Sequence, residues 1–147
     1  MKKIPIGLKD YRKLKEENYY VVDKSLMIKE FMDRGSEVTL ITRPRRFGKT
    51  INMSMLAEFF DVTKDSLEIF KDTAIMQSEY AKDINSYPTI FLSFADAKGD
   101  KNNIVMQMKL QLLKEYKKNK QVLEHIDIFE KPGFDMVMKG MSDLQDE

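Results

Sequence analysis

The order of apolar and polar positions predicts short strands that alternate with longer helices. Three short apolar runs, YYVV at 19–22, EVTLIT at 37–42 and TIFLSF at 89–94, are bounded by glycine, proline or polar residues. Runs of this kind are typical of strands, and the second and third have the composition of buried ones. Elsewhere apolar residues recur at spacings of three and four, which predicts helices over about 26–34, 50–60 and 102–123.

These elements predict an α/β fold. Strands that alternate with helices favour a three-layer arrangement in which helices flank a small, mostly parallel sheet. For the first helix we expect Asp23 or Ser25 as the cap and Gly35 as the stop. The apolar stripes of the three helices are predicted to be Leu26, Met27, Phe31 and Met32, then Met53, Leu56, Phe59 and Phe60, and then Ile104, Met108, Leu112, Leu113 and Tyr116.

Composition narrows the class of protein. A chain of 147 residues with 42% hydrophobic content can bury one core, so residues 1–147 are predicted to belong to one domain. The net charge of +1 provides no global attraction to nucleic acid or an anionic membrane. The absence of cysteine and the single histidine exclude disulfides and cysteine- or histidine-rich metal sites. No run approaches the roughly 20 apolar residues of a membrane span, so we expect a soluble, cytoplasmic protein with no membrane partner.

The segment RPRRFGKT, residues 43–50, joins the second predicted strand to the second predicted helix. Gly48 permits close approach of the backbone to a phosphate, Lys49 supplies charge for the β- and γ-phosphates, and Thr50 supplies a hydroxyl for Mg²⁺ at the start of a helix. The general pattern G-x-x-x-x-G-K-[ST] would place its first glycine at position 43, where this chain has Arg43. The residues alone therefore allow a phosphate-binding loop or a basic surface turn, and the flanking strand and helix favour the loop.

Residues 19–56, YYVVDKSLMIKEFMDRGSEVTLITRPRRFGKTINMSML, resemble the amino-terminal part of the AAA-ATPase-like family of predicted bacterial and archaeal ATPases. In that family a tyrosine-rich segment and VDKS precede a phosphate loop written R-P-R-R-F-G-K-T, which residues 43–50 match at every position. The run YPTIFLSFADAKG, at 87–99, also resembles the family's next core strand. The resemblance extends from about residue 4 to residue 99.

The resemblance implies a partial P-loop NTPase fold that binds ATP together with Mg²⁺. The nucleotide would be held by the second half of the loop and the start of the helix after it, with Thr50 as the metal ligand. The choice between ATP and GTP stays open. The residues to which the resemblance assigns nucleotide binding are Arg45, Arg46, Phe47, Gly48, Lys49 and Thr50.

P-loop enzymes also need a second strand that ends in acidic residues, which hold the metal's water shell and polarise the attacking water. Neither Asp96 nor Asp127 follows a suitable apolar run, and no glutamate comes directly after either aspartate. We therefore expect residues 1–147 to be the amino-terminal part of such a domain, truncated before that strand, and we expect hydrolysis to be impaired. The uncovered strand edge of such a sheet would favour a homo-oligomer.

Two other interpretations stay open. Arg43, Arg45 and Arg46 could form a basic surface turn or a small nucleic-acid contact, although nucleic acid enters only by association with the family. The chain as a whole could be a non-catalytic remnant that acts as a protein or nucleic-acid interaction module. The segment Asp23, Lys24 and Ser25 is most simply a helix cap, with a nucleotide contact as the alternative.

Overall fold

The structure is a computed structural model, and it describes residues 2–42, 44, 47–94, 101–123, 131–133, 135 and 139. The chain divides into two compact units, residues 1–89 and residues 90–147, and each is described by itself. Within the described residues, no helix combines the length and the apolar character required to cross a membrane.

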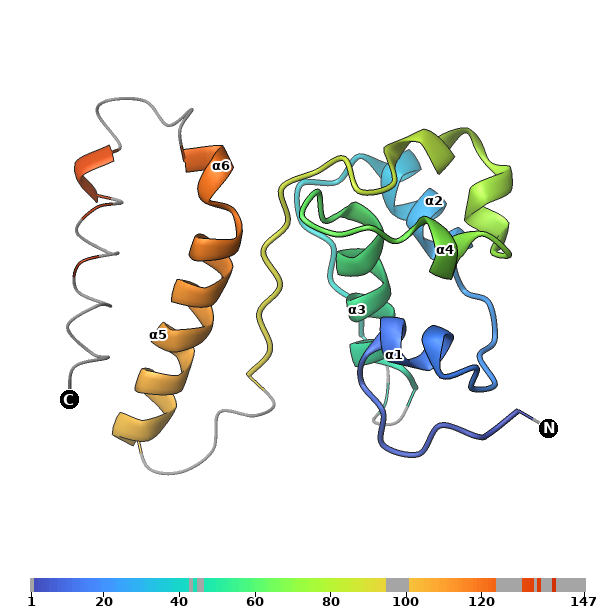
Figure 1. The fold of residues 1–147 in the computed structure, drawn as a ribbon, viewed down its shortest axis with the longest axis horizontal. Helices are drawn as coiled ribbons and strands as arrows, with labels where there is room; N and C mark the ends of the chain where they lie inside the picture. Colours follow the sequence, from blue (N-terminus) through green and yellow to red (C-terminus); the bar gives the residue numbers. More distant parts are fainter. Residues whose placement is uncertain are drawn as a thin grey trace. The chain divides into compact units, whose positions relative to one another are not determined.

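The first unit is built from helices joined by extended segments (Figure 1). Its α-helices are α1 (Tyr11–Glu16), α2 (Leu26–Arg34), α3 (Lys49–Phe60) and α4 (Leu67–Phe70). Two 3₁₀ helices follow, η1 (Ala74–Gln77) and η2 (Glu79–Asp83). The two long helices, α2 and α3, have the bounds that the spacing of apolar residues predicts, and Gly35 ends α2 in the left-handed conformation, at φ 54°.

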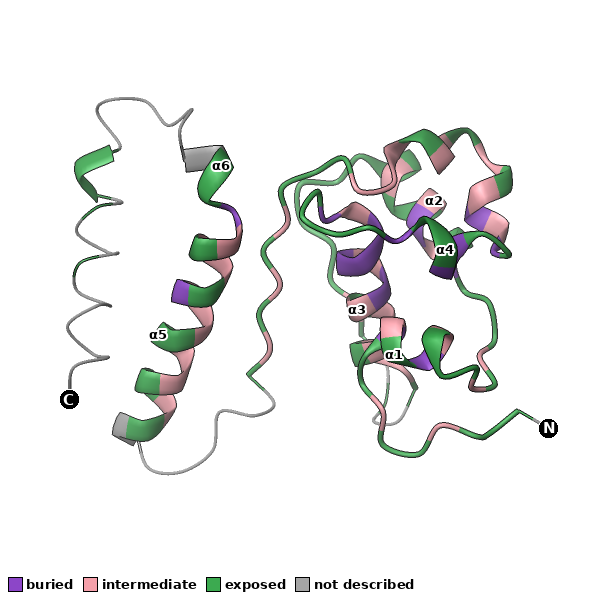
Figure 2. Ribbon diagram, in the orientation of Figure 1, coloured by how far each residue is buried: buried purple, intermediate pink, exposed green. Residues whose placement is uncertain are grey.

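The core of this unit gathers around the middle of α3. Figure 2 shows buried positions concentrated on α3 and on the parts of the neighbouring elements that pack against it. The ring of Phe59 contacts the ring of Phe70 edge to face, with centroids 5.4 Å apart, and Tyr11 stacks on Phe70 at 5.2 Å. The buried cluster comprises Tyr11, Ile28, Met55, Phe59, Ile69, Phe70 and Ile75.

The predicted buried faces of α2 and α3 are partly wrong. On α2 the buried residue is Ile28, whereas Leu26, expected in the core, is 49% exposed. On α3 Phe59 is buried as expected, but Met53 is 44% exposed and the charged Glu58 is buried. A helix rich in apolar residues can bury more than one of its faces, and the elements that pack against it decide which face is buried.

The predicted strands and the predicted parallel sheet are wrong for this structure. The described residues contain no β-strand, only two isolated parallel bridges, Lys3 with Tyr19 and Asp61 with Tyr87. Val38 and Leu40, predicted to be buried in a strand, are 85% and 84% exposed. A strand requires a neighbour that satisfies its N–H and C=O groups, and an apolar run specifies no such neighbour. The α/β three-layer class is therefore replaced by a helical one.

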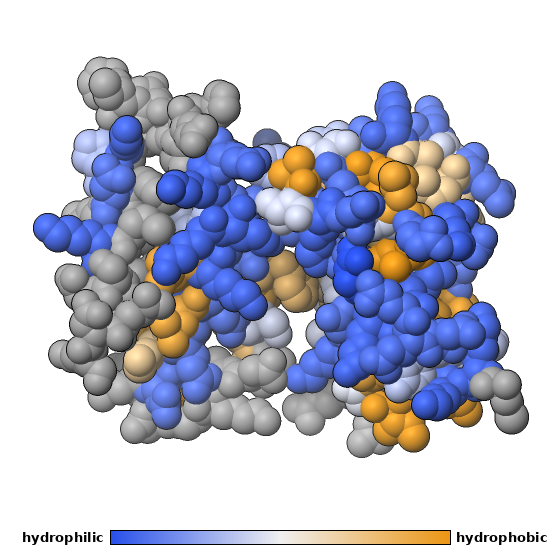
Figure 3. All heavy atoms as spheres, viewed as in Figure 1, coloured by the Kyte–Doolittle hydropathy of each residue, from blue (hydrophilic) through white to orange (hydrophobic). Residues whose placement is uncertain are grey.

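Exposed apolar side chains are consequently part of the surface of the first unit. On the face in view, Figure 3 shows hydrophobic side chains between hydrophilic ones. The predicted homo-oligomer depended on an open edge of a sheet, so it stays a prediction without that structural support.

The second unit contains α5 (Lys101–Lys118) and α6 (Lys120–Leu123), which correspond to the single helix predicted over 102–123. The predicted stripe of α5 is confirmed, because Leu113 is buried and Ile104, Met108, Leu112 and Tyr116 are half-buried. The extended run 90–94 bonds to α5 side chains in place of a neighbouring strand. The backbone N–H of Phe91 donates to Glu115 Oε2 at 3.1 Å, and that of Ser93 donates to Gln111 Oε1 at 3.2 Å.

Candidate functional site

The start of α3 is the local feature on which the candidate site depends. Gly48 is the residue before the helix and adopts φ 75° and ψ 16°, the left-handed region that side chains with a Cβ disfavour. Its carbonyl accepts the first helical hydrogen bond, from Asn52 N at 2.9 Å. No side chain caps this helix start, and Gly48 itself has none to offer. The first backbone N–H groups of α3 therefore point out of the helix end without a side-chain acceptor from the cap residue.

The predicted site residues that the structure describes are consecutive at this helix start. Phe47 is 61% exposed, Thr50 is exposed, and Lys49 is half-buried. The ammonium of Lys49 donates to the carbonyl of Pro44 at 3.3 Å, so it folds back over the loop. Arg45 and Arg46 lie outside the described residues, as does Arg43, and the structure does not test their roles. Asp96 and Asp127 also lie outside the described residues.

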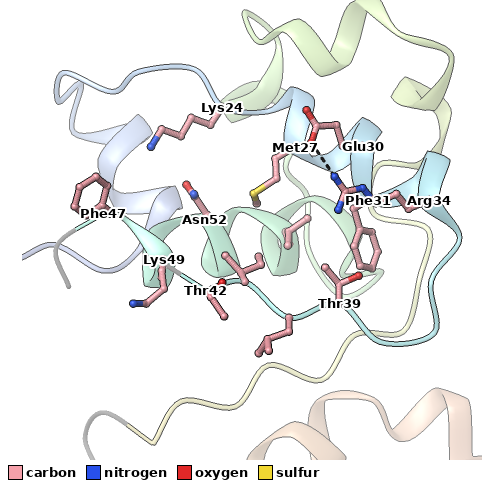
Figure 4. A pocket seen from close by; sticks show the side chains of 13 residues that line it. Lys24, Met27, Glu30, Phe31, Arg34, Thr39, Thr42, Phe47, Lys49 and Asn52 are labelled. Carbon is pink, nitrogen blue, oxygen red and sulfur yellow. Dashed lines mark ion pairs between the residues drawn. The ribbon is translucent and has the colours of Figure 1, made fainter. Parts of the chain in front are cut away.

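A cavity of about 700 Å³ opens beside this helix start. That volume is in the range of sites for small molecules and cofactors. Figure 4 shows Lys24, Phe47, Lys49 and Asn52 at one end of the cavity and Glu30, Phe31 and Arg34 at the other. Its walls come from α2, the extended segment before the loop, and α3. The lining residues are Lys24, Met27, Glu30, Phe31, Arg34, Thr39, Leu40, Ile41, Thr42, Phe47, Lys49, Asn52 and Leu56.

The charged groups on the cavity wall are mainly cationic. Lys24, Arg34 and Lys49 contribute positive charge, and Glu30 is the single carboxylate among the described lining residues. Glu30 forms a long ion pair with Arg34, at 4.0 Å, drawn as a dashed line in Figure 4. The loop end of the cavity thus presents two ammonium groups, an arrangement that suits an anion better than a cation. Among the described residues, no group of three or more His, Cys, Asp or Glu side chains could hold a metal ion.

Lys24 is the residue of this site whose place the sequence did not predict. A Cβ built on Gly48 would lie 4.0 Å from Lys24 Nζ, so the ammonium stands directly over the glycine of the loop. From the sequence, the segment Asp23, Lys24 and Ser25 is most simply a helix cap, with a nucleotide contact as the alternative. Ser25 does precede α2, but its side chain makes no capping hydrogen bond to that helix.

Asp23 and Ser25 bind instead to the backbone at the start of η1. Asp23 Oδ2 accepts from Ala74 N at 2.8 Å, and the buried Ser25 Oγ accepts from Ile75 N at 3.0 Å. Burial opposes ionisation of Asp23, but the N–H donors of Ala74 and Ser25 outweigh it and hold the pKa of this carboxyl below its ordinary value. The Ser25 side chain therefore does not cap α2, whereas Asp23 Oδ1 accepts from Ser25 N at 2.8 Å just before the helix. The two side chains also fix the backbone on both sides of Lys24.

Comparisons with known proteins give a family for this chain and a relative that matches part of it. A family model described as Predicted AAA-ATPase matches residues 5–143, nearly the whole chain. A relative from Azotobacter chroococcum mcd 1, described as an uncharacterized protein in the vnfD 5'region, is 42% identical over 60 residues. That match covers 40% of this chain and 11% of the relative, so this chain spans a small part of the relative's length. No solved structure matches the chain.

Proposed function

This chain belongs to the predicted AAA-ATPase family, and from that premise we propose that it binds a nucleoside triphosphate, ATP, at the start of α3. The observation that carries the proposal is the conformation of Gly48, left-handed at φ 75° directly before a 12-residue helix, with Lys49 beside it. Backbone N–H groups at a helix start and a nearby ammonium are the elements that bind phosphate oxygens. The cavity at this helix start offers space for the rest of the ligand.

Each described residue of the loop has one proposed role. Gly48 allows phosphate oxygens to approach the backbone, and Lys49 binds the β- and γ-phosphates once its ammonium leaves the carbonyl of Pro44. Thr50, exposed at the first turn, supplies the hydroxyl ligand for a Mg²⁺ ion that arrives with the nucleotide. Phe47, also exposed, offers an apolar wall, and Arg45 and Arg46 are proposed to offset phosphate charge.

Binding is tested by titration calorimetry with Mg-ATP on the full chain and on two lysine variants. Lys49→Ala removes the proposed phosphate ligand, whereas Lys82→Ala removes an exposed lysine of η2 that does not line the cavity. A hydrogen bond to a charged group contributes about 1.5–3 kcal/mol, so we expect Lys49→Ala to weaken binding by about tenfold or more. Wild-type affinity in Lys49→Ala, or no heat of binding in the wild type, would contradict the proposal.

We propose also that this chain turns ATP over slowly. Phosphoryl transfer in P-loop enzymes requires an acid that orders the metal shell and the attacking water. The one carboxylate of the described cavity wall, Glu30, lies at the end opposite Lys49 and pairs with Arg34. Phosphate release by purified protein should therefore be close to that of Lys49→Ala. Turnover near one per second that Lys49→Ala removes would contradict this part of the proposal.

The non-catalytic interaction module is the other outcome of the calorimetric test. It would be supported by a folded wild type that gives no heat with Mg-ATP. Binding that Lys49→Ala weakens and Lys82→Ala leaves unchanged would reject it as the primary role of this loop.

A further inference from the structure

We propose that Lys24 is a second phosphate ligand of this site, held in place by its two neighbours, Asp23 and Ser25. This inference rests on the proposed nucleotide binding and adds to it a residue outside the loop. It also gives a role to residues 22–25, VDKS, which precede α2 and are distant from the loop along the chain.

The position of the Lys24 ammonium is the first argument. Its Nζ is the nearest heavy atom that a Cβ on Gly48 would meet, at 4.0 Å. Lys24 also lines the same cavity as Lys49, and Figure 4 shows both side chains at the end where Phe47 lies. A phosphate bound to the backbone at Gly48 would consequently lie near the Lys24 ammonium, with Lys49 as the next residue along the chain. Lysine binds phosphate as a compact point charge, so it needs proximity and no fixed planar geometry.

The charge balance around Lys24 is the second argument. Lys24 Nζ makes no hydrogen bond or ion pair with another described residue, so its charge is not offset within the described part of the chain. Two lysines at one end of a cavity repel each other, and the repulsion is relieved when an anion binds between them. A chain of phosphates carries several negative charges, so it relieves the repulsion better than a single carboxylate does.

The anchoring of the backbone is the third argument. Asp23 and Ser25 bind the N–H groups of Ala74 and Ile75, at 2.8 and 3.0 Å, so the residues before and after Lys24 are both fixed to η1. A flexible lysine on a mobile segment would lose much conformational entropy on binding a ligand. Fixing the backbone on both sides of Lys24 reduces that loss, because only the side chain has to be ordered.

The experiment measures the affinity of five proteins for Mg-ATP and for inorganic tripolyphosphate: wild type, Lys24→Ala, Lys24→Arg, Lys49→Ala and Lys82→Ala. We expect Lys24→Ala to weaken the binding of both ligands by the same factor, roughly tenfold, because the lost contact is to the phosphates. Lys82→Ala is the matched control, and Lys24→Arg, which keeps the charge, should recover most of the affinity. Thermal melting without ligand checks that each variant is folded.

The outcomes separate this inference from the proposal on which it rests. If Lys49→Ala weakens ATP binding and Lys24→Ala has wild-type affinity, the loop binds nucleotide and the assignment of Lys24 is overturned. If Lys24→Ala weakens the binding of ATP but leaves the binding of tripolyphosphate unchanged, Lys24 contacts the nucleoside and the phosphate assignment is overturned. If Lys82→Ala has the same effect as Lys24→Ala, the cause is net charge and the assignment also fails. Wild-type affinity in Lys49→Ala would overturn the proposed function itself.

Discussion

Arg12 and Glu58 form an ion pair between α1 and α3, with Arg12 Nε donating to Glu58 Oε1 at 2.7 Å. The Glu58 side chain is only 2% exposed, and it also accepts from Ser66 Oγ at 3.0 Å and pairs with Lys64. A buried carboxylate with this many donors is well compensated for its loss of hydration. Because Glu58 lies on α3, which begins at Lys49, these contacts hold the carboxyl-terminal half of the helix whose first residues form the candidate site.

Replacing Glu58 should strongly destabilise the first unit. Removal of one partner of a buried ion pair typically costs about 3–5 kcal/mol. Arg12 and Lys64 keep 32% and 35% exposure and can be rehydrated, so we expect the lower end, about 3 kcal/mol, for Glu58→Ala. Urea unfolding followed by circular dichroism measures the loss. The control is Glu16→Ala, whose exposed pair with Arg12 should contribute only about 0.3–0.5 kcal/mol. Equal effects of the two changes would contradict the assignment.

The buried phenol of Tyr11 should make the protein sensitive to alkali. Burial, with a further contribution from the charge of Asp23, raises the pKa of Tyr11 above its ordinary value of 10.0. The unfolded chain therefore loses this proton first, so the stabilisation is fully present below pH 10 and is lost as the pH rises above it. Tyr11→Phe should lose less stability between pH 9 and pH 11 than the wild type, whereas Tyr20→Phe, at a tyrosine 60% exposed, is the control. Parallel pH profiles for wild type and Tyr11→Phe would argue against this.

Asp23 should have the opposite pH dependence. Its pKa is lowered in the folded state, so its contribution to stability is present above 3.8, the ordinary value, and is lost as the pH falls through the lower folded value. The wild type should be more stable than Asp23→Asn at pH 6, and the difference should shrink below pH 4. Thermal melts at a series of pH values test this. A difference that stays constant down to pH 3 would mean that the hydrogen bond to Ala74 does not depend on the carboxylate charge.

Asn85 connects the end of α3 to the segment that follows it. Its Nδ2 donates to Asp61 O at 2.9 Å and to Glu58 O at 3.2 Å, while its Oδ1 accepts from Ser66 N at 2.8 Å. The residue is in the left-handed region, at φ 51°. Asn85→Ala loses these bonds and strains the backbone, so it should cost about 3 kcal/mol. Asn85→Gly loses the same bonds without the strain and should be about 1 kcal/mol less destabilising, as measured by urea unfolding. An equal or larger loss for glycine would contradict the role of the backbone conformation.

Local patterns in the sequence predicted the helical elements well because helices depend on neighbours along the chain. Gly35 and the apolar spacing before it predicted where α2 ends, and the stripe of Leu112, Leu113 and Tyr116 predicted the less exposed side of α5. Gly48 was predicted to permit close backbone approach, and its φ of 75° is a conformation that glycine tolerates. Each hydrogen bond of a helix joins residues four positions apart, so a short stretch of sequence is enough to predict these features.

Contacts between residues far apart in the sequence decided the features that local patterns did not predict. The apolar runs at 37–42 and 89–94 specify extended backbone, but only a partner can make them strands, and within the described residues Phe91 and Ser93 bond to side chains of α5 instead. The sequence contains Glu58 in an apolar stretch, but its burial depends on Arg12, 46 positions away. It contains Lys24 next to a predicted helix cap, but only the attachment of Asp23 and Ser25 to η1 places that lysine over Gly48. Packing between segments far apart in the sequence has no local signal. For this reason the sequence by itself predicted a helix that starts beside Gly48 and Lys49, while only the tertiary structure placed the Lys24 ammonium near Gly48.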